Sequence, residues 1–304
     1  MTEKLAIQTK DLVKFYGSVQ ALYGVDLDVR RGEIFGFLGP NGAGKTTTIR
    51  CLLDLIRPQG GSISVLGLNP QKDAVAVRAR TGYLPGELSM ESNLRVKAQL
   101  RYYSDLRSNE TDWNFVEELA ERLDLDLTMR IKNLSKGNKQ KVGVVQALMS
   151  RPELLLMDEP TAGLDPLMQQ ETYRMLREAQ ANGATVFFSS HIINEVEALA
   201  DRVAIIREGV IAEEAEPADL VSLEMRTVHV RFKERIDPTA LSNVEGVTLL
   251  SHRNGTEVNL RVEGEIDGLI KALAAYTVVD MDVDLPSLEE VFLAYYETDK
   301  KEVD

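Results

Sequence analysis

Cysteine is almost absent from this chain, which has a single one, Cys51, among its 304 residues. One cysteine excludes any disulfide within the chain. Cys51 falls on the apolar face of a predicted helix, so we expect it to be a small core residue.

Long hydrophobic runs are absent as well. No uninterrupted apolar stretch approaches the roughly 18 residues that a membrane-spanning helix needs, although hydrophobic residues make up 44% of the chain. The opening Met-Thr-Glu-Lys-Leu-Ala lacks the apolar segment of a secretory signal peptide. We therefore expect a cytoplasmic protein in which no segment spans a bilayer.

Basic residues are outnumbered by acidic ones. Lys and Arg total 35 against 48 Asp and Glu, which gives a net charge of −13. This balance argues against a nucleic-acid partner, because neutralising phosphates requires clustered cations. A local basic groove is the alternative that composition leaves open. The length of 304 residues fits about two globular domains.

The stretch from Gly39 to Thr47 is the most informative motif. It fits the phosphate-loop pattern of Gly, four residues, then Gly-Lys followed by Ser or Thr. Its residues are Gly39, Pro40, Asn41, Gly42, Ala43, Gly44, Lys45, Thr46 and Thr47. The glycines let the backbone wrap a phosphate and point successive N–H groups at it. Lys45 is expected to reach the β- and γ-phosphates, and the Thr46 hydroxyl to ligate Mg²⁺.

The surroundings of this loop favour a phosphate site over a glycine-rich turn that fits the pattern by chance. Residues 33–38 form an apolar run typical of a buried strand, and residues 46–56 have the apolar spacing of a helix. A helix that begins at the loop adds the positive end of its dipole to the site. We infer that the chain binds a nucleoside triphosphate.

Strands and helices alternate through residues 1–215, which predicts an α/β domain with a mainly parallel, helix-covered sheet. The expected strands are 5–9, 25–29, 33–38, 63–66, 81–87, 154–157, 185–189 and 203–206, with turns at 17–18 and 31–32. The expected helices are 46–56, 71–80, 93–106, 113–123, 167–181, 193–200 and one that ends at Met149, with Ser135 or Asn138 as its N-cap. Residues 88–150, approximately, form a helical insertion in this domain.

The pattern changes near residues 213–217, where acidic residues cluster before Pro217. Residues 216–304 are predicted to form a small α+β domain. Its expected strands are 227–233, 247–251, 256–262 and 277–283, and its expected helices are 266–275 and 286–296. This part has no phosphate loop and no metal-ligand spacing, so His229 and His252 are expected to be structural or surface residues.

Three acid–base side chains follow predicted strands of the first domain. Asp158 and Glu159 end the apolar strand 154–157, as expected for a buried parallel strand that delivers acids at its carboxyl end. Asp158 is a candidate ligand of Mg²⁺, and Glu159 a candidate to orient or deprotonate the attacking water. His191 follows strand 185–189 and is suited to donate to a γ-phosphate oxygen.

Tyr16 is a candidate to stack on an adenine ring, since it lies at a strand end ahead of the phosphate loop. Core packing or a cross-strand aromatic pair is the alternative for this side chain.

Taken together, these motifs resemble those of the ATPases of ABC transporters. Gly39–Thr47, Leu134–Asn138, Leu154–Glu159, Ala162–Asp165 and His191 are similar to the Walker A, signature, Walker B, D-loop and switch-histidine motifs, in the family's order. The similarity covers about residues 4–215. The remainder resembles the C-terminal accessory domain of ATPase subunits that serve separately encoded exporter permeases.

The resemblance implies a P-loop ABC cassette that binds ATP and Mg²⁺ and works as a dimer of two copies, or with a homologous ATPase. Each ATP would lie between one subunit's phosphate loop and the other's signature residues, which are Ser135, Lys136, Gly137 and Asn138. Asp165 would lie at the subunit interface. Glu159 and His191 would promote hydrolysis, and an integral-membrane permease would hold the protein at the inner face of the cell membrane, with one of its cytosolic helices against residues 86–106.

Two positions depart from the family pattern. The signature commonly has Gly and Gln where this chain has Lys136 and Asn138, and Lys136 either reaches the partner's ATP or points to solvent. The usual Gln after Tyr83-Leu-Pro85 is replaced by Gly86, which has no side chain to hold a metal or a water. Glu87 is the candidate to take that metal-binding role, and backbone movement of the loop is the alternative.

Two other functions remain as alternatives to the exporter subunit. A soluble ABC ATPase acting on ribosomes or DNA usually has two cassettes or long coiled-coil insertions, whereas this chain has one phosphate loop and no sustained heptad run. A nucleotide sensor without hydrolysis is opposed by the presence of Glu159 and His191.

Overall fold

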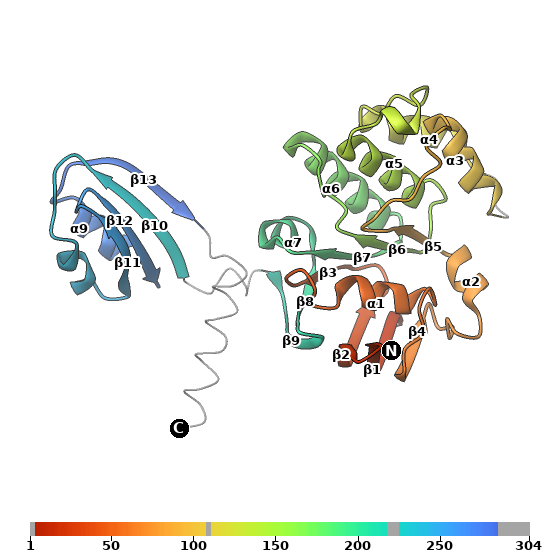
Figure 1. Ribbon diagram of the computed structural model, residues 1–304, viewed down its shortest axis with the longest axis horizontal. Coiled ribbons are helices and arrows are strands. Elements are labelled where there is room, and N and C mark those ends of the chain that lie inside the picture. Colours follow the sequence, from red (N-terminus) through yellow and green to blue (C-terminus); the bar gives the residue numbers. More distant parts are fainter. Residues whose placement is uncertain (1–3, 108–110, 218–224, 285–304) are drawn as a thin grey trace. The chain divides into compact units, whose positions relative to one another are not determined.

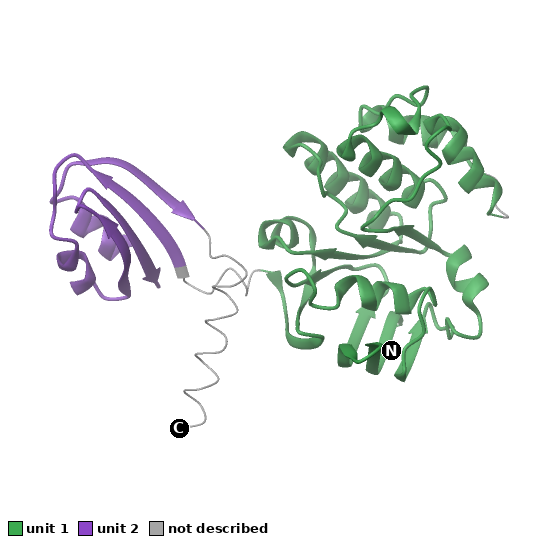
Figure 2. Cartoon of the chain, viewed as in Figure 1, with its two compact units in different colours: residues 1–217 green, residues 218–304 purple. Residues whose placement is uncertain are grey.

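The chain folds into two compact units, residues 1–217 and 218–304 (Figure 2). The computed structural model describes residues 4–107, 111–217 and 225–284. Each unit has its own sheet and its own cluster of buried apolar side chains. The phosphate loop and all the predicted catalytic residues belong to unit 1.

A six-stranded sheet forms the centre of unit 1, with the strand order β5-β6-β7-β3-β8-β9. Its strands are β3 (Ile34–Leu38), β5 (Thr81–Leu84), β6 (Leu154–Asp158), β7 (Thr185–Ser190), β8 (Arg202–Arg207) and β9 (Val210–Ala215). All neighbouring pairs are parallel except β8 and β9, so the predicted mainly parallel sheet is confirmed. Every residue of β3, β6 and β7 is buried, as the continuous apolar runs predict.

A smaller antiparallel sheet lies beside the central one. It consists of β1 (Leu5–Tyr16), β2 (Val19–Arg30) and β4 (Gly60–Val65), in the order β2-β1-β4. Buried residues of β1 and β2 share one apolar cluster with α1 and with the β3–β6–β7 face of the central sheet. In that cluster Phe187 packs against Phe35 and Phe37, with ring centroids 5.8 and 5.3 Å away.

Helices cover the central sheet on both sides. They are α1 (Lys45–Leu52), α2 (Ala74–Ala79), α3 (Val96–Asp105), α4 (Trp113–Arg122), α5 (Lys136–Leu148), α6 (Pro166–Ala181) and α7 (Ile193–Leu199), with the 3-10 helix η1 (Ile131–Asn133). Figure 1 shows α1 between the two sheets and α3 to α6 on the opposite side of the central sheet. Among the residues that the structure describes, no helix has both the length and the apolar character needed to cross a membrane.

Unit 2 is an antiparallel sheet with helices packed on one face. Its strands are β10 (Met225–Phe232), β11 (Val247–Arg253), β12 (Glu257–Glu263) and β13 (Val278–Asp284), in the order β11-β12-β10-β13. The helix α9 (Asp267–Leu273) and the 3-10 helix η2 (Pro238–Asn243) complete its apolar cluster. His229 bonds to Asn259 and Asp284 at 2.7 and 3.1 Å.

The structure corrects several predicted boundaries. β1 and β2 have 12 residues each, more than twice the predicted lengths, because register shifts let the pairing continue past positions where the alternation breaks. α1 ends at Leu52 rather than at residue 56, since Asp54 turns into the left-handed region with a φ of 51°. β9 was not predicted, and the expected helix 286–296 lies outside the described residues.

Candidate nucleotide site

The phosphate loop connects the end of β3 to the start of α1. Gly44 has a φ of 113°, a left-handed conformation that a side chain disfavours. Gly39 is constrained by space instead, because a Cβ there would lie 2.3 Å from the carbonyl oxygen of Ile206. Glycine at these two positions therefore follows from the backbone path that wraps the loop around the first turn of α1.

Lys45 is the first residue of α1, and its side chain is buried back under the loop. Its Nζ donates to the carbonyl oxygens of Gly39 at 2.6 Å and Pro40 at 3.3 Å. The same Nζ lies 3.4 Å from Oε1 of Glu159. A cation that is only 6% exposed is thus fixed at the centre of the loop, where it can neutralise phosphate charge with little screening by water.

The Asp158 carboxylate lies at the carboxyl end of β6 between two hydroxyl groups. Thr46 donates to Oδ2 at 2.7 Å, and Ser189 of β7 donates to Oδ1 at 2.6 Å. Asp158 is 1% exposed. This is an oxygen-rich arrangement of the kind that Mg²⁺ prefers, with a single carboxylate and room for phosphate oxygens.

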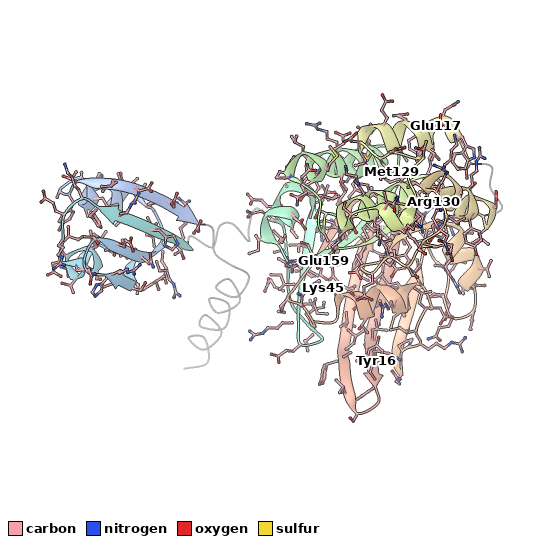
Figure 3. All side chains as sticks on the ribbon, turned by 45° about the horizontal axis from the view of Figure 1, so that its top comes forward. Tyr16, Lys45, Glu117, Met129, Arg130 and Glu159 are labelled. Carbon is pink, nitrogen blue, oxygen red and sulfur yellow. The ribbon has the colours of Figure 1, made fainter. Side chains whose placement is uncertain are left out.

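Glu159 follows Asp158 in an unusual conformation that turns its side chain into the site. Its φ of 54° is left-handed, and its amide donates to the backbone and side-chain oxygens of Ser189 at 3.2 and 3.1 Å. Its carboxylate lies between Lys45 and His191, whose Nδ1 is 2.8 Å from Oε2. Figure 3 shows Lys45 and Glu159 side by side.

Lys45, Thr46, Asp158 and Glu159 line one cavity of about 320 Å³, whereas Gly39, Ser189 and His191 are not among its lining residues. Its lining consists of Ala21, Pro40, Asn41, Gly42, Gly44, Lys45, Thr46, Thr47, Arg50, Gly86, Glu87, Asp158 and Glu159. Two cations, a helix N-terminus and a carboxylate beside a hydroxyl fit a triphosphate with its metal. Among the described residues no group of three or more His, Cys, Asp and Glu could hold a metal alone. The Thr46 hydroxyl and the Asp158 carboxylate are the groups that would hold Mg²⁺, together with phosphate oxygens.

Arg50 is a lining residue that the sequence analysis missed. It lies one helical turn after Thr46 on α1, a spacing that places both side chains on the same face of the helix. Arg50 also bonds to the Tyr83 hydroxyl. Burial raises the pKa of Tyr83, and the Asp158 carboxylate raises it further, while Arg50 opposes the shift.

The comparisons with known proteins agree with this site. A family model described as ABC transporter matches residues 22–162. The bacitracin transport ATP-binding protein BcrA of Bacillus licheniformis is 39% identical over 211 residues, which cover 68% of this chain and 69% of that protein. The daunorubicin resistance ATP-binding protein DrrA3 of Streptomyces coeruleorubidus is 36% identical over 306 residues, which cover 95% of each. The chain belongs to the ABC transporter family of ATP-binding proteins.

A solved structure of an ATP-binding subunit of an ABC transporter shares the fold of unit 1. It is 30% identical, has a TM-score of 0.65, and the match covers 71% of this chain and 91% of that one. The predicted ABC cassette is thereby confirmed as the fold of unit 1. The family is one of ATPases, so the triphosphate that the site accepts is ATP.

The signature residues of this ABC cassette lie at the start of α5, away from the phosphate loop. Ser135 is the N-cap of α5, and its hydroxyl accepts from the Asn138 amide at 3.2 Å. The side chain of Lys136 is exposed. Gly137 packs so close to the loop after β6 that a Cβ there would lie 2.5 Å from the Gly163 carbonyl oxygen. None of residues 135–138 lines the cavity.

Of three other predicted site residues, one lines the cavity, one caps a helix and one lies outside the cavity. Glu87 lines the cavity beside Gly86, and a Cβ at Gly86 would lie only 3.0 Å from Oδ2 of Asp158. Asp165 caps α6 by accepting from the amides of Leu167 and Met168 at 3.1 and 3.0 Å. Tyr16 is 46% exposed and does not line the cavity, although it lies at the end of β1 as predicted.

The Lys14 ammonium lies 5.4 Å from the centre of the Tyr16 ring. Because the Tyr16 side chain is 46% exposed, it is not part of the core, and it is not paired with another described aromatic side chain. Its role in stacking on adenine stays a prediction.

The buried cation gives the first testable prediction. Lys45→Ala removes the charge at the centre of the loop, so ATP should bind about ten- to a hundredfold more weakly in titration calorimetry. Lys72→Ala is the matched control, because the Lys72 side chain is exposed outside the cavity. Equal ATP affinity of Lys45→Ala and the parent chain would contradict the assignment of the loop.

Proposed function

We propose that this protein is the ATP-hydrolysing subunit of an exporter whose permease is a separate membrane protein. The observation that carries the proposal is the convergence of Lys45, Thr46, Asp158 and Glu159 on one cavity. These side chains supply a phosphate-binding cation, a metal site and a candidate base. The transport and resistance functions in the names of the bacitracin and daunorubicin relatives, together with the similarity over both units, support export.

In this proposal Glu159 acts on the water that attacks the γ-phosphate. The carboxylate orients the water and takes its proton, while His191 holds Oε2 of the carboxylate through Nδ1. Lys45 neutralises negative charge on the phosphates in the transition state. Mg²⁺ held by Thr46 and Asp158 would supply further charge neutralisation when bound.

A second copy of the chain completes the site in this proposal. The N-terminus of α5 is a suitable phosphate contact, since the first turn of a helix presents backbone amides and this one also has the hydroxyl of Ser135. Because none of residues 135–138 lines the cavity of their own chain, these residues are available to the ATP of a partner. ATP then joins two subunits, and hydrolysis releases them. A permease attached to both subunits would therefore be shifted between two conformations, because ATP binds the joined state better than the separate one.

The surface around α3 is the proposed contact for the permease. Tyr102 and Leu106 are large apolar side chains that are 53% and 67% exposed at the C-terminal end of this helix. They follow the loop that carries Gly86 and Glu87, so the same segment reaches both the cavity and this surface. Such a contact would place the protein at the inner face of the membrane.

The membrane partner is tested by affinity purification of the tagged chain from detergent-solubilised membranes. We expect an integral-membrane protein to co-purify in stoichiometric amount, and Tyr102→Glu combined with Leu106→Glu to reduce its recovery at least about fivefold, because charge disfavours an apolar contact. Purification of the chain alone from membranes and cytosol, or recovery that is insensitive to both substitutions, contradicts this contact.

The catalytic assignment predicts that Glu159→Gln binds ATP normally but loses at least about a hundredfold in turnover, because an amide cannot accept the proton. The variant should also remain dimeric in gel filtration with ATP. Glu118→Gln is the control for a change of charge, since Glu118 is exposed on α4. A rate of ATP hydrolysis by Glu159→Gln equal to that of the parent chain would contradict the catalytic role of Glu159.

The dimer predicts a separate effect at the signature. Ser135→Ala should lower turnover about tenfold while leaving ATP affinity of the isolated chain unchanged, since the hydroxyl serves the partner's site. The substitution also removes a helix cap worth about 1 kcal/mol. Asp112→Ala removes the corresponding cap of α4 and controls for that loss. A fall in monomer ATP affinity would instead place Ser135 in the site of its own chain.

A further inference from the structure

A buried carboxylate on α7 lies outside the cavity and has no part in the chemistry described so far. Glu195 is 6% exposed. One of its oxygens accepts a hydrogen bond from the Thr161 hydroxyl, and the other accepts from the Ser190 hydroxyl at 2.5 Å. Thr161 and Ser190 are 2% and 0% exposed. Both carboxylate oxygens are thus satisfied, one by a hydroxyl from the loop after β6 and the other by the hydroxyl of Ser190, the last residue of β7.

Each of these two segments lies next to one of the predicted catalytic residues. Ser190 immediately precedes His191, and its hydroxyl also accepts from the amide of Ile192 at 3.0 Å, which closes a tight turn around His191. Thr161 follows Glu159 by two residues. Glu195 therefore ties the segment that presents the histidine to the segment that presents the carboxylate, and these two side chains meet 2.8 Å apart.

Tyr173 of α6 extends the network. It is 8% exposed and bonds to Thr161 through its side chain. Burial raises the pKa of Tyr173, and the Glu195 carboxylate raises it further. The network of Tyr173, Thr161, Glu195 and Ser190 thus joins α6, the loop after β6, α7 and the end of β7 without water-exposed members.

The loop after β6 also contacts the signature helix. Gln140 of α5 donates to the carbonyl oxygens of Glu159 and Pro160 at 2.8 and 3.1 Å. Three residues farther along, Gly163 packs against Gly137. The loop that presents Glu159 is therefore in direct contact with the N-terminal part of α5.

We propose that Glu195 is a positioning residue for ATP hydrolysis: it fixes the loop of Thr161 against the turn of Ser190, so that Glu159 and His191 keep their mutual geometry. The inference rests on the proposed hydrolytic function. Loss of the carboxylate removes the acceptor of the Thr161 hydroxyl and leaves the Ser190 hydroxyl only the longer contact of 3.4 Å to the Ile192 carbonyl oxygen, which favours rearrangement of both segments. Small displacements of positioned groups lower the rate of a reaction strongly and leave binding largely intact.

The test compares steady-state ATP hydrolysis by full-length variants. Glu195→Ala should lower kcat about tenfold or more and change KM for ATP less than about twofold, because the phosphate loop does not belong to the network. Glu195→Gln should retain kcat within about threefold, since the amide can accept from one hydroxyl and donate to the other. Glu197→Ala is the matched control on the exposed side of the same helix.

A second pair of variants tests the network without changing Glu195. Thr161→Val and Ser190→Ala should each lower kcat, and the double variant should lose no more than about twice the larger single loss, because either break uncouples the loops. Losses that multiply, or an unchanged kcat in folded Glu195→Ala, overturn the inference. An equal fall of kcat and ATP affinity also overturns it, since it indicates general disruption.

The same assay separates this inference from the proposed function. If Glu159→Gln abolishes ATP hydrolysis and Glu195→Ala does not lower it, the result contradicts only the positioning role of Glu195. A parent chain without any ATP hydrolysis contradicts both. If Glu195→Ala does not fold, as judged by circular dichroism, the pair at Thr161 and Ser190 decides the question alone.

Discussion

The register of the central parallel sheet is the constraint on which the site depends. Leu38 of β3 pairs with Ser190 of β7, and Ser189 pairs with Asp158 of β6, so three strand ends lie in one row. The phosphate loop follows β3 at that row, the candidate catalytic residue His191 follows β7, and the candidate metal ligand Asp158 ends β6 there. A shift of β7 by one residue would move Ser189 away from Asp158 and would exchange the side chains that pack on the two buried faces of this strand.

Hydrogen bonds at these strand ends hold the side chains of the candidate site in position. Thr46 and Ser189 approach the Asp158 carboxylate from α1 and β7, and this carboxylate therefore has a fixed position between two separate elements. Glu159 is turned into the cavity by a strained backbone that two bonds to Ser189 support. The strain is local, and the buried surroundings of β6 and β7 supply the stability that maintains it.

Much of unit 1 was predictable from the sequence because its signals are local. The glycine spacing at residues 39–44, the apolar runs of β3, β6 and β7, and the acids after β6 each depend on neighbours in the chain. The lengths of β1 and β2 were not predictable, since irregular pairing extends them. The acidic hairpin strand β9 was missed for a related reason, because pairing with β8 rather than an apolar run defines it.

The residues of the candidate site also differ in whether the local sequence indicates them. The loop, Asp158 and Glu159 were found by motif, and the structure brings them together in one cavity. Arg50 was missed although its helical spacing from Thr46 was available as a signal. The contacts of Glu195 join residues that are five and 34 positions apart in the chain, and nothing in the local sequence indicates the longer one. The position of Tyr16 at the end of β1 was predicted correctly, and its stacking on adenine stays a prediction.

The solitary thiol of Cys51 lies within the apolar cluster around α1 and is 1% exposed. Burial raises the pKa of this thiol to about 11, so it is neither accessible nor ionised near neutral pH. A cysteine introduced at a surface position would therefore be the sole group to react with maleimide reagents. Spectroscopic labels or cross-linkers can thus be attached one site at a time on the native background, which would make the proposed separation of two subunits directly measurable.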